Sequence, residues 1–177
     1  MKIVNELAPD ELEALENEWC FKARPEQILP VGDWNCWLIQ TGRGWGKTRT
    51  GAESVIDAVR SGVAKRVHLV ARAASDVRDV MVEGESGILS VSPPDFRPEY
   101  EPSKRRLTWP NGATATTFSS EQPDQLRGPQ GWRAVLNCIA RQPLNVILHG
   151  VMNSLLGAIP RPGICSFSDS GLGFIPA

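Results

Sequence analysis

The sequence Leu-Ile-Gln-Thr-Gly-Arg-Gly-Trp-Gly-Lys-Thr, residues 38–48, decides the fold expected for this chain. An apolar run ends here in a glycine-rich turn, and Gly-Lys-Thr then opens a stretch in which apolar residues recur at helical spacing. Backbone N–H groups in such a turn point toward anions, and the N-terminus of the following helix adds a positive partial charge. The order of strand, turn and helix therefore predicts a loop that holds the phosphates of a nucleotide.

The residue types in this turn suit phosphate binding. Lys47 is expected to reach the terminal phosphates, and the Thr48 hydroxyl is expected to hold Mg²⁺. The turn glycines permit the tight backbone and are assigned to the same site: they are Gly42, Gly44 and Gly46. Thr41 stands where the usual pattern has glycine, so the match is one residue short. The alternative is an ordinary strand–turn–helix corner with a surface lysine.

Strands are expected on either side of a helix next to this loop. The apolar runs at 36–40 and 66–71 predict two strands, and residues 47–61 predict the helix between them. A strand–helix–strand unit of this length predicts a parallel pair, and with it an α/β fold in which helices flank a parallel sheet.

Three more segments have recognisable patterns. Residues 8–20 predict a helix with one apolar face. A further helix is expected to begin with Ser75 as its N-cap and to end near Gly87. Residues 105–119 predict a β-hairpin that turns at Pro-Asn-Gly.

Composition narrows the class of protein. The net charge of -1 over 177 residues predicts no general attraction to nucleic acid or membrane. The four cysteines have no metal-ligand spacing, which favours reduced thiols in a cytoplasmic protein. The acidic, amphipathic start is not typical of a signal peptide, and no run is long enough to span a membrane.

Several separated stretches together resemble one family. GDWNCWL, GRGWGKTRTGAE, RDVMVEGESGIL, YEPSKRRLTWPNGA and DQLRGPQ look like the N-terminal ATPase half of bacteriophage terminase large subunits, over about residues 27–130. These proteins drive DNA into empty capsids. The resemblance implies ATP and Mg²⁺ as cofactors, and double-stranded phage DNA, the portal protein and the small terminase subunit as partners. It also implies the cytoplasm of a bacterial host.

The resemblance implies further site residues. Arg43 stands where some terminases place an arginine that senses or stabilises the γ-phosphate, and a guanidinium there suits catalysis; the alternative is a solvated loop residue. Gln27 precedes the loop by about twenty residues, where related motors read adenine, and the alternative is a polar turn residue. The basic cluster Lys104–Arg106 could contact DNA phosphates, but a charged hairpin edge is the preferred interpretation.

The family pattern breaks after residue 130. A phosphate-loop ATPase also needs an Asp that orders Mg²⁺ and a Glu that activates water. Terminases place this pair shortly after LRGPQ, but Asp169 is the only acid in 131–177, which also has no Lys and no Glu. Residues 1–130 are therefore expected to form a partial ATPase domain, and 131–177 an irregular, poorly ordered tail outside the family. The chain is then an incomplete phosphate-loop NTPase without the nuclease domain, and its hydrolytic activity stays an open question.

Two explanations compete for the lost acids. Back-translation from His149 in a shifted frame permits Trp-Cys-Asp-Glu-Leu-Ala, which is the expected family segment, so a frameshift from about residue 131 is one hypothesis. The other aligns Asn137 and Cys138 with the lost Asp and Glu as simple divergence. With either explanation, the expected function is a packaging ATPase remnant that binds Mg-ATP with little or no hydrolysis. The alternatives are a nucleotide-binding module without turnover and an unrelated small NTPase or kinase.

Overall fold

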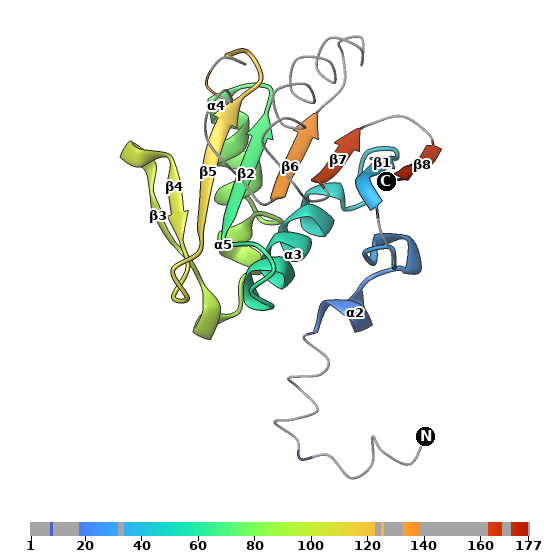
Figure 1. Cartoon of the computed structure of the whole chain (residues 1–177), viewed down its shortest axis with the longest axis horizontal. Helices are drawn as coiled ribbons and strands as arrows, with labels where there is room; N and C mark the ends of the chain where they lie inside the picture. Colours follow the sequence, from blue (N-terminus) through green and yellow to red (C-terminus); the bar gives the residue numbers. More distant parts are fainter. Residues whose placement is uncertain are drawn as a thin grey trace. The chain divides into compact units, whose positions relative to one another are not determined.

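The computed structural model describes residue 8 and residues 18–31, 34–122, 125, 133–138, 163–167 and 171–176 (Figure 1). The chain divides into two compact units, Met1–Val31 and Gly32–Ala177. The first unit contains the short helix α2 (Trp19–Lys22) and the 3-10 turn η2 (Pro25–Gln27). Most of the helix expected over 8–20 lies outside the described residues.

The second unit is built on one mixed sheet, with the strand order β3-β4-β5-β2-β6-β7-β1-β8 (Figure 1). The strands are β1 (Trp34–Gln40), β2 (Arg66–Ala71), β3 (Glu99–Glu101), β4 (Arg106–Thr108), β5 (Thr114–Ser119), β6 (Arg133–Cys138), β7 (Gly163–Phe167) and β8 (Gly171–Pro176). The central strands β5, β2, β6, β7 and β1 are parallel, and the pairs β3–β4, β4–β5 and β1–β8 are antiparallel. The carboxyl ends of the parallel strands meet at one edge, where open α/β sheets bind ligands.

Strands β1 and β2 are parallel, as expected, but they are not neighbours. Strands β6 and β7 lie between them, so the predicted pair is wrong as a pair. The two inserted strands come from residues beyond 130, and a local strand–helix–strand pattern contains no information about such long-range insertions.

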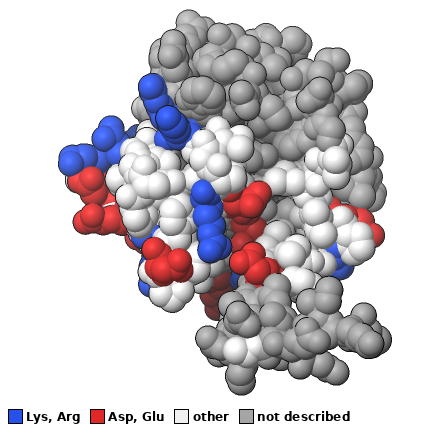
Figure 2. Space-filling view, turned by 60° about the horizontal axis from the view of Figure 1, so that its bottom comes forward, with Lys and Arg blue, Asp and Glu red and all other residues white. Residues whose placement is uncertain are grey.

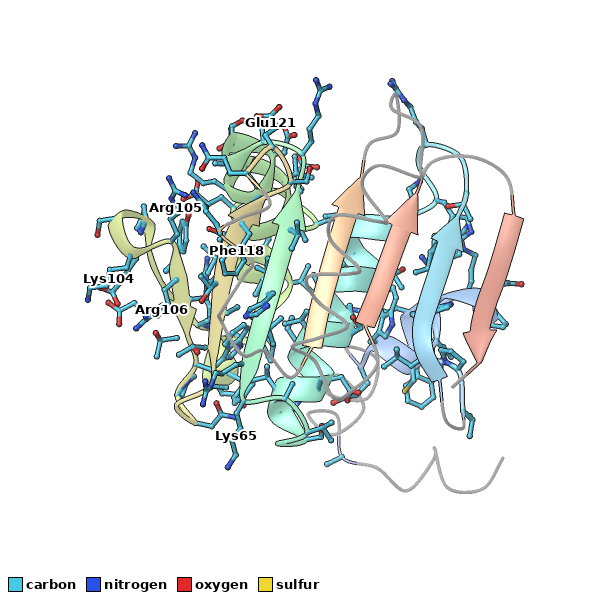
Figure 3. The ribbon with its side chains drawn as sticks, turned by 45° about the horizontal axis from the view of Figure 1, so that its top comes forward. Lys65, Lys104, Arg105, Arg106, Phe118 and Glu121 are labelled. Carbon is cyan, nitrogen blue, oxygen red and sulfur yellow. The ribbon has the colours of Figure 1, made fainter. Side chains whose placement is uncertain are left out.

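Helix α3 (Lys47–Arg60) confirms the helix expected over 47–61. Its buried side chains recur at helical spacing and include Ala52, Val55, Ile56 and Val59. The helix contacts β6 and β7, and Figure 3 shows it crossing the sheet behind these strands. Strand β2 is buried from Val67 to Ala71, as expected for a strand in the middle of a parallel sheet.

The second predicted helix differs in both its ends and its type. It consists of one turn, α4 (Ala74–Asp76), followed by the π-helix η3 (Val77–Val82). Its N-cap is Ala73 rather than Ser75, and the Asp76 carboxylate accepts the Ala73 N–H at 3.2 Å. The helix stops before Gly87 because the chain turns back on itself there: a Cβ on Gly87 would lie 2.7 Å from the Val82 carbonyl oxygen. Three short elements follow: α5 (Ile88–Val91), η4 (Pro94–Phe96) and η5 (Pro102–Lys104).

The predicted hairpin is confirmed. Strands β4 and β5 pair antiparallel, with Leu107 opposite Ala115, and β3 adds a third strand at the edge. The Trp109 N–H donates to the Ala113 carbonyl at 2.9 Å, and Gly112 has a φ of 81°. This geometry suits a three-residue turn that needs a left-handed residue at its end.

Three short strands lie within residues 131–177, where the sequence predicts an irregular tail. Residues of β6, β7 and β8 take part in the sheet, and β7 and β8 flank β1 on both sides. The glycines and prolines of 157–177 favoured a loop locally, but Ile164–Phe167 and Leu172–Ile175 also contain the apolar residues of short strands. Pairing with β1 outweighs the local preference.

Candidate nucleotide site

The glycine-rich turn lies at the carboxyl edge of the sheet, between β1 and α3. Strand β1 ends at Gln40, and α3 begins at Lys47. Two glycines of the turn have left-handed backbones, Gly44 with a φ of 77° and Gly46 with a φ of 93°. Gly46 is also the N-cap of α3. The three-element arrangement expected from the sequence is therefore present, and the glycines are needed because other residues rarely adopt such angles.

Lys47 closes this turn from the inside. Its Nζ donates to the carbonyl oxygens of Thr41 at 2.8 Å and Gly42 at 2.7 Å. Partial burial lowers the pKa of the Lys47 ammonium from its ordinary value of 10.5. A surface lysine on an ordinary corner would extend into water. The geometry instead holds a positive charge at the N-terminus of a 14-residue helix, where anions are stabilised.

The turn has space on its outer side. A Cβ placed on Gly42 or Gly44 would meet no atom within 4 Å. Arg43 between them is exposed, and Thr48 in the first turn of α3 is half-buried. The turn is open and lined by glycine. It has the Lys47 ammonium bonded to its backbone, the exposed Arg43 on its outer side and the Thr48 hydroxyl at the start of the helix. These groups fit a phosphate with a bound Mg²⁺. The individual roles of Arg43 and Thr48 stay predictions.

Two threonines support the loop, and the sequence did not predict these roles. Thr41 supplies a carbonyl that holds Lys47, although it occupies the position where glycine was expected. The Thr50 hydroxyl donates to the Gly46 carbonyl at 3.0 Å, which secures the first turn of α3. Hydroxyl residues near a helix start are a recognisable signal for such bonds.

Gln27 lies in the first unit, whereas the phosphate loop lies in the second. Its side-chain oxygen accepts the N–H of Arg24 at 3.0 Å, and it is buried. A capping interaction thus orients the amide locally. This contact does not test the expected role in adenine binding.

The basic cluster is remote from the loop. Lys104, Arg105 and Arg106 lie at the start of β4 (Figure 3), and four strands separate β4 from β1. Lys104 pairs with Glu101 at 2.6 Å. On the face shown in Figure 2, basic and acidic side chains alternate over the described residues rather than forming one basic surface. This mixture agrees with the preferred interpretation of a charged hairpin edge.

A buried histidine lies in the middle of the sheet. His68 of β2 is only 3 % exposed, and its ring packs edge-on against Phe118 at 5.0 Å between centroids. Its Nδ1 has no hydrogen-bond partner among the described residues. Burial lowers the pKa of the imidazole, and the positive charge of Arg66 adds to this effect. No chemistry was assigned to His68 from the sequence, and its surroundings favour a neutral core residue.

A family model matches the part of the chain that contains the phosphate loop. The model described as "Terminase large subunit, T4likevirus-type, N-terminal" matches residues 38–137, which include the loop, α3, the hairpin and nearly all of β6. The chain belongs to the terminase large subunit family. No curated protein matches the sequence.

Solved terminase structures share the fold. The ATPase domain of the large terminase of Thermus phage P74-26 superposes with a TM-score of 0.64 at 17 % identity, covering 94 % of this chain and 72 % of that one. A mutant of the same domain has a TM-score of 0.61 at 16 % identity, with the same coverage. The large terminase of a thermophilic bacteriophage has a TM-score of 0.54 at 12 % identity, covering 88 % of this chain and 37 % of that one. At these identities the likeness establishes the fold, which is that of a terminase ATPase domain.

The carboxyl end of β6 is the part of the described chain that follows the LRGPQ segment, after which the resemblance implies the Asp–Glu pair. Asn137 pairs with Ala71 of β2 and with Ser166 of β7, one residue before the strand ends at Cys138. One strand, β7, separates β6 from β1, so the two strand axes are about 10 Å apart. The carboxyl end of β6 therefore lies at the same edge of the sheet as the phosphate loop, and its last two residues are Asn137 and Cys138.

In the part of the chain that the structure describes, no group of three or more His, Cys, Asp or Glu side chains could hold a metal ion. None of the helices in that part of the terminase chain is long and apolar enough to cross a membrane.

Proposed function

We propose that this chain binds Mg-ATP through the loop 41–48, as the ATPase part of a phage DNA-packaging terminase large subunit. The observation that carries the proposal is the Lys47 ammonium, held on the Thr41 and Gly42 carbonyls at the start of α3. Its place is fixed before any ligand arrives, so little side-chain entropy is lost on binding. Bound Mg²⁺ would neutralise charge on the phosphate oxygens.

The other predicted site residues have proposed roles in nucleotide binding. Thr48 would hold Mg²⁺ with its hydroxyl, and Arg43 would approach the terminal phosphate from the exposed side of the turn. The backbone N–H groups around Gly42, Gly44 and Gly46 would face the phosphates. Gln27 would contact the adenine edge with its amide.

We further propose that hydrolysis is weak or absent. The parallel register brings the end of β6 to the ligand edge, but Asn137 and Cys138 stand there instead of an Asp–Glu pair. The Asn amide has no basic site that could take a proton from water, and a neutral Cys thiol is a poorer base than the carboxylate that a phosphate-loop ATPase uses. A nucleotide-binding module without turnover is the second candidate, and this observation favours it.

The origin of 131–177 is part of the proposal. The family match through Asn137 and the pairing of β6 support divergence over that strand, whereas the absence of Lys and Glu after residue 130 supports a shifted frame. The coding DNA with its downstream flank separates the two. If no shifted frame encodes Trp-Cys-Asp-Glu, the frameshift hypothesis fails.

The expected partners follow from the family. We propose double-stranded DNA, the portal protein and the small terminase subunit as partners in the bacterial cytoplasm. The pairing of Lys104 with Glu101 reduces the positive charge of the Lys104–Arg106 cluster, so we do not single out that cluster as the DNA contact.

Binding of a fluorescent ATP analogue with Mg²⁺ tests the central proposal. Lys47→Ala should weaken binding about 10- to 100-fold, because hydrogen bonds to charged groups contribute about 1.5–3 kcal/mol. Lys65→Ala is the matched control, since Lys65 is an exposed lysine after α3 (Figure 3). Equal affinity for wild type and Lys47→Ala would refute the nucleotide site.

A further inference from the structure

Helix α3 has a fixed contact at the end opposite the phosphate loop. The last four carbonyls of an α-helix lack donors from the helix itself. In α3 the Ala58 carbonyl accepts the Ala64 N–H at 2.8 Å. The Val59 carbonyl accepts two donors, the Gly62 N–H at 3.1 Å and the Asn111 Nδ2 at 2.9 Å.

The Asn111 donor comes from the turn between β4 and β5, 52 residues along the chain. The other side of its amide is also occupied, because Oδ1 accepts the Ala113 N–H at 3.1 Å. The turn itself is closed by the Gly112 N–H, which donates to the Trp109 carbonyl at 2.9 Å. Trp109 is buried. Asn111 is therefore oriented by a turn that is anchored in the core.

This bond adds a directional restraint to the packing of α3. Several side chains of α3 are apolar and buried, with Val55 and Val59 fully buried. Close packing limits the movement of these side chains, but apolar contact is non-directional and sets no bond length or angle along the helix axis. A hydrogen bond from a rigid turn to one carbonyl has a defined length and angle. Because a helix of this length, about 21 Å, moves nearly as a unit, the Val59 contact also sets the position of its N-terminus.

We propose that Asn111 is a positioning residue of the nucleotide site: it fixes α3 along its axis and thereby places Lys47 and Thr48 against the end of β1. This inference rests on the proposed function, since it concerns how the same loop is held. It adds a residue remote from the loop, on the sheet hairpin, to those that determine nucleotide affinity.

Asn111→Asp tests the inference with the least change of shape. The carboxylate retains an acceptor for the Ala113 N–H, but it places an oxygen instead of a donor against the Val59 carbonyl. Asn111→Ala is the second variant, in which the donor is lost without the added charge. Ser119→Ala is the matched control. It removes another long-range bond from a side chain to a carbonyl, Ser119 Oγ to Arg72 O at 2.6 Å, that does not involve α3.

The affinity for the Mg²⁺–ATP analogue should fall about five- to tenfold in both Asn111 variants, an effect in the range of one lost hydrogen bond. Ser119→Ala should stay within about twofold of wild type. Urea unfolding gives the free energy of unfolding of all three variants, so that their affinities can be compared with the loss of stability taken into account. If Ser119→Ala weakens binding as much as the Asn111 variants do, Asn111 acts through general stability and the inference is overturned.

Hydrogen exchange without nucleotide separates this test from the proposed function. Both Asn111 variants should speed exchange at Gly62 and Ala64, next to the last turn of α3, and at Thr50, whose N–H donates to the Gly46 carbonyl at the start of the helix, whereas Ser119→Ala should not. Unchanged exchange at both ends of α3 would overturn the inference even in a protein that binds ATP. If the wild type binds no ATP analogue but the Asn111 variants exchange faster as expected, the nucleotide site is refuted, whereas the role of Asn111 in positioning α3 is supported.

Discussion

The ends of β1 and β6 lie at the same edge of the sheet, but they differ in the residues that they carry. After β1 come two left-handed glycines, a lysine bonded to backbone carbonyls and the start of a helix. At the end of β6, with only β7 between it and β1, the residues are Asn137 and Cys138, neither of which is an acid. The comparison leads us to expect that groups for phosphate binding and for water activation would lie on separate strands, so that one function could be lost while the other is retained.

The largest expected effect tests this separation directly. Wild-type hydrolysis of Mg-ATP should be close to background, and the double variant Asn137→Asp, Cys138→Glu should raise it about 10²- to 10⁴-fold, the usual contribution of general-base help. Steady-state phosphate release measures both. A wild-type turnover of about 1 s⁻¹ or more would show that the acids lie elsewhere in the chain.

A smaller effect should follow from the backbone of the loop. Gly46→Ala places a Cβ at a φ of 93° and should destabilise the fold by about 1–2 kcal/mol, with weaker binding of the ATP analogue. Urea unfolding and a binding titration measure the two consequences. Gly42→Ala is a suitable control for the unfolding measurement alone, since a Cβ there meets no atom of the chain within 4 Å, whereas Gly42 itself belongs to the proposed phosphate site. Equal losses of stability in both variants would mean that the left-handed turn has no special role.

The pH dependence of stability should report on the packing beside β6. His68 pairs with Ala134 of β6, and burial lowers its pKa below 6.5. The unfolded chain therefore takes up a proton before the folded one does, so stability is fully present above pH 6.5 and is lost as the pH falls toward the lower folded pKa. Urea unfolding at pH 7.5 and 5.5 should show this loss in wild type and a smaller loss in His68→Phe. An identical loss in both proteins would place the titrating group elsewhere.

The smallest expected effect concerns a left-handed residue that is not glycine. Arg105 has a φ of 52° without being glycine, at the turn before β4. Arg105→Gly should stabilise the protein by up to about 1 kcal/mol, because the left-handed strain exceeds the added entropy of the unfolded chain. Thermal unfolding measures the change, and Arg106→Gly, within a strand, should instead destabilise. A loss of stability in Arg105→Gly would mean that contacts of the guanidinium outweigh the strain.

Local signals determined the local parts of the site. Glycines before Lys47 specify a turn that other residues adopt poorly, and the apolar spacing of α3 specifies which face it buries. The hairpin around Asn111 was equally predictable, since Pro-Asn-Gly favours such a turn. These elements depend on neighbours within a few residues, so their sequences contain the necessary information.

The tertiary structure alone decided the order of the strands and the contacts between remote segments. The insertion of β6 and β7 between β1 and β2 depends on pairings across more than 60 residues of chain, for which a local pattern has no signal. The same holds for the bond from Asn111 to α3, which joins residues 52 apart, whereas the Lys47 contacts with the Thr41 and Gly42 carbonyls are local. The sequence by itself therefore predicted the groups of the candidate loop. The strand order and the bond that holds the far end of α3 were decided by the tertiary structure, because they join segments that are remote in the chain.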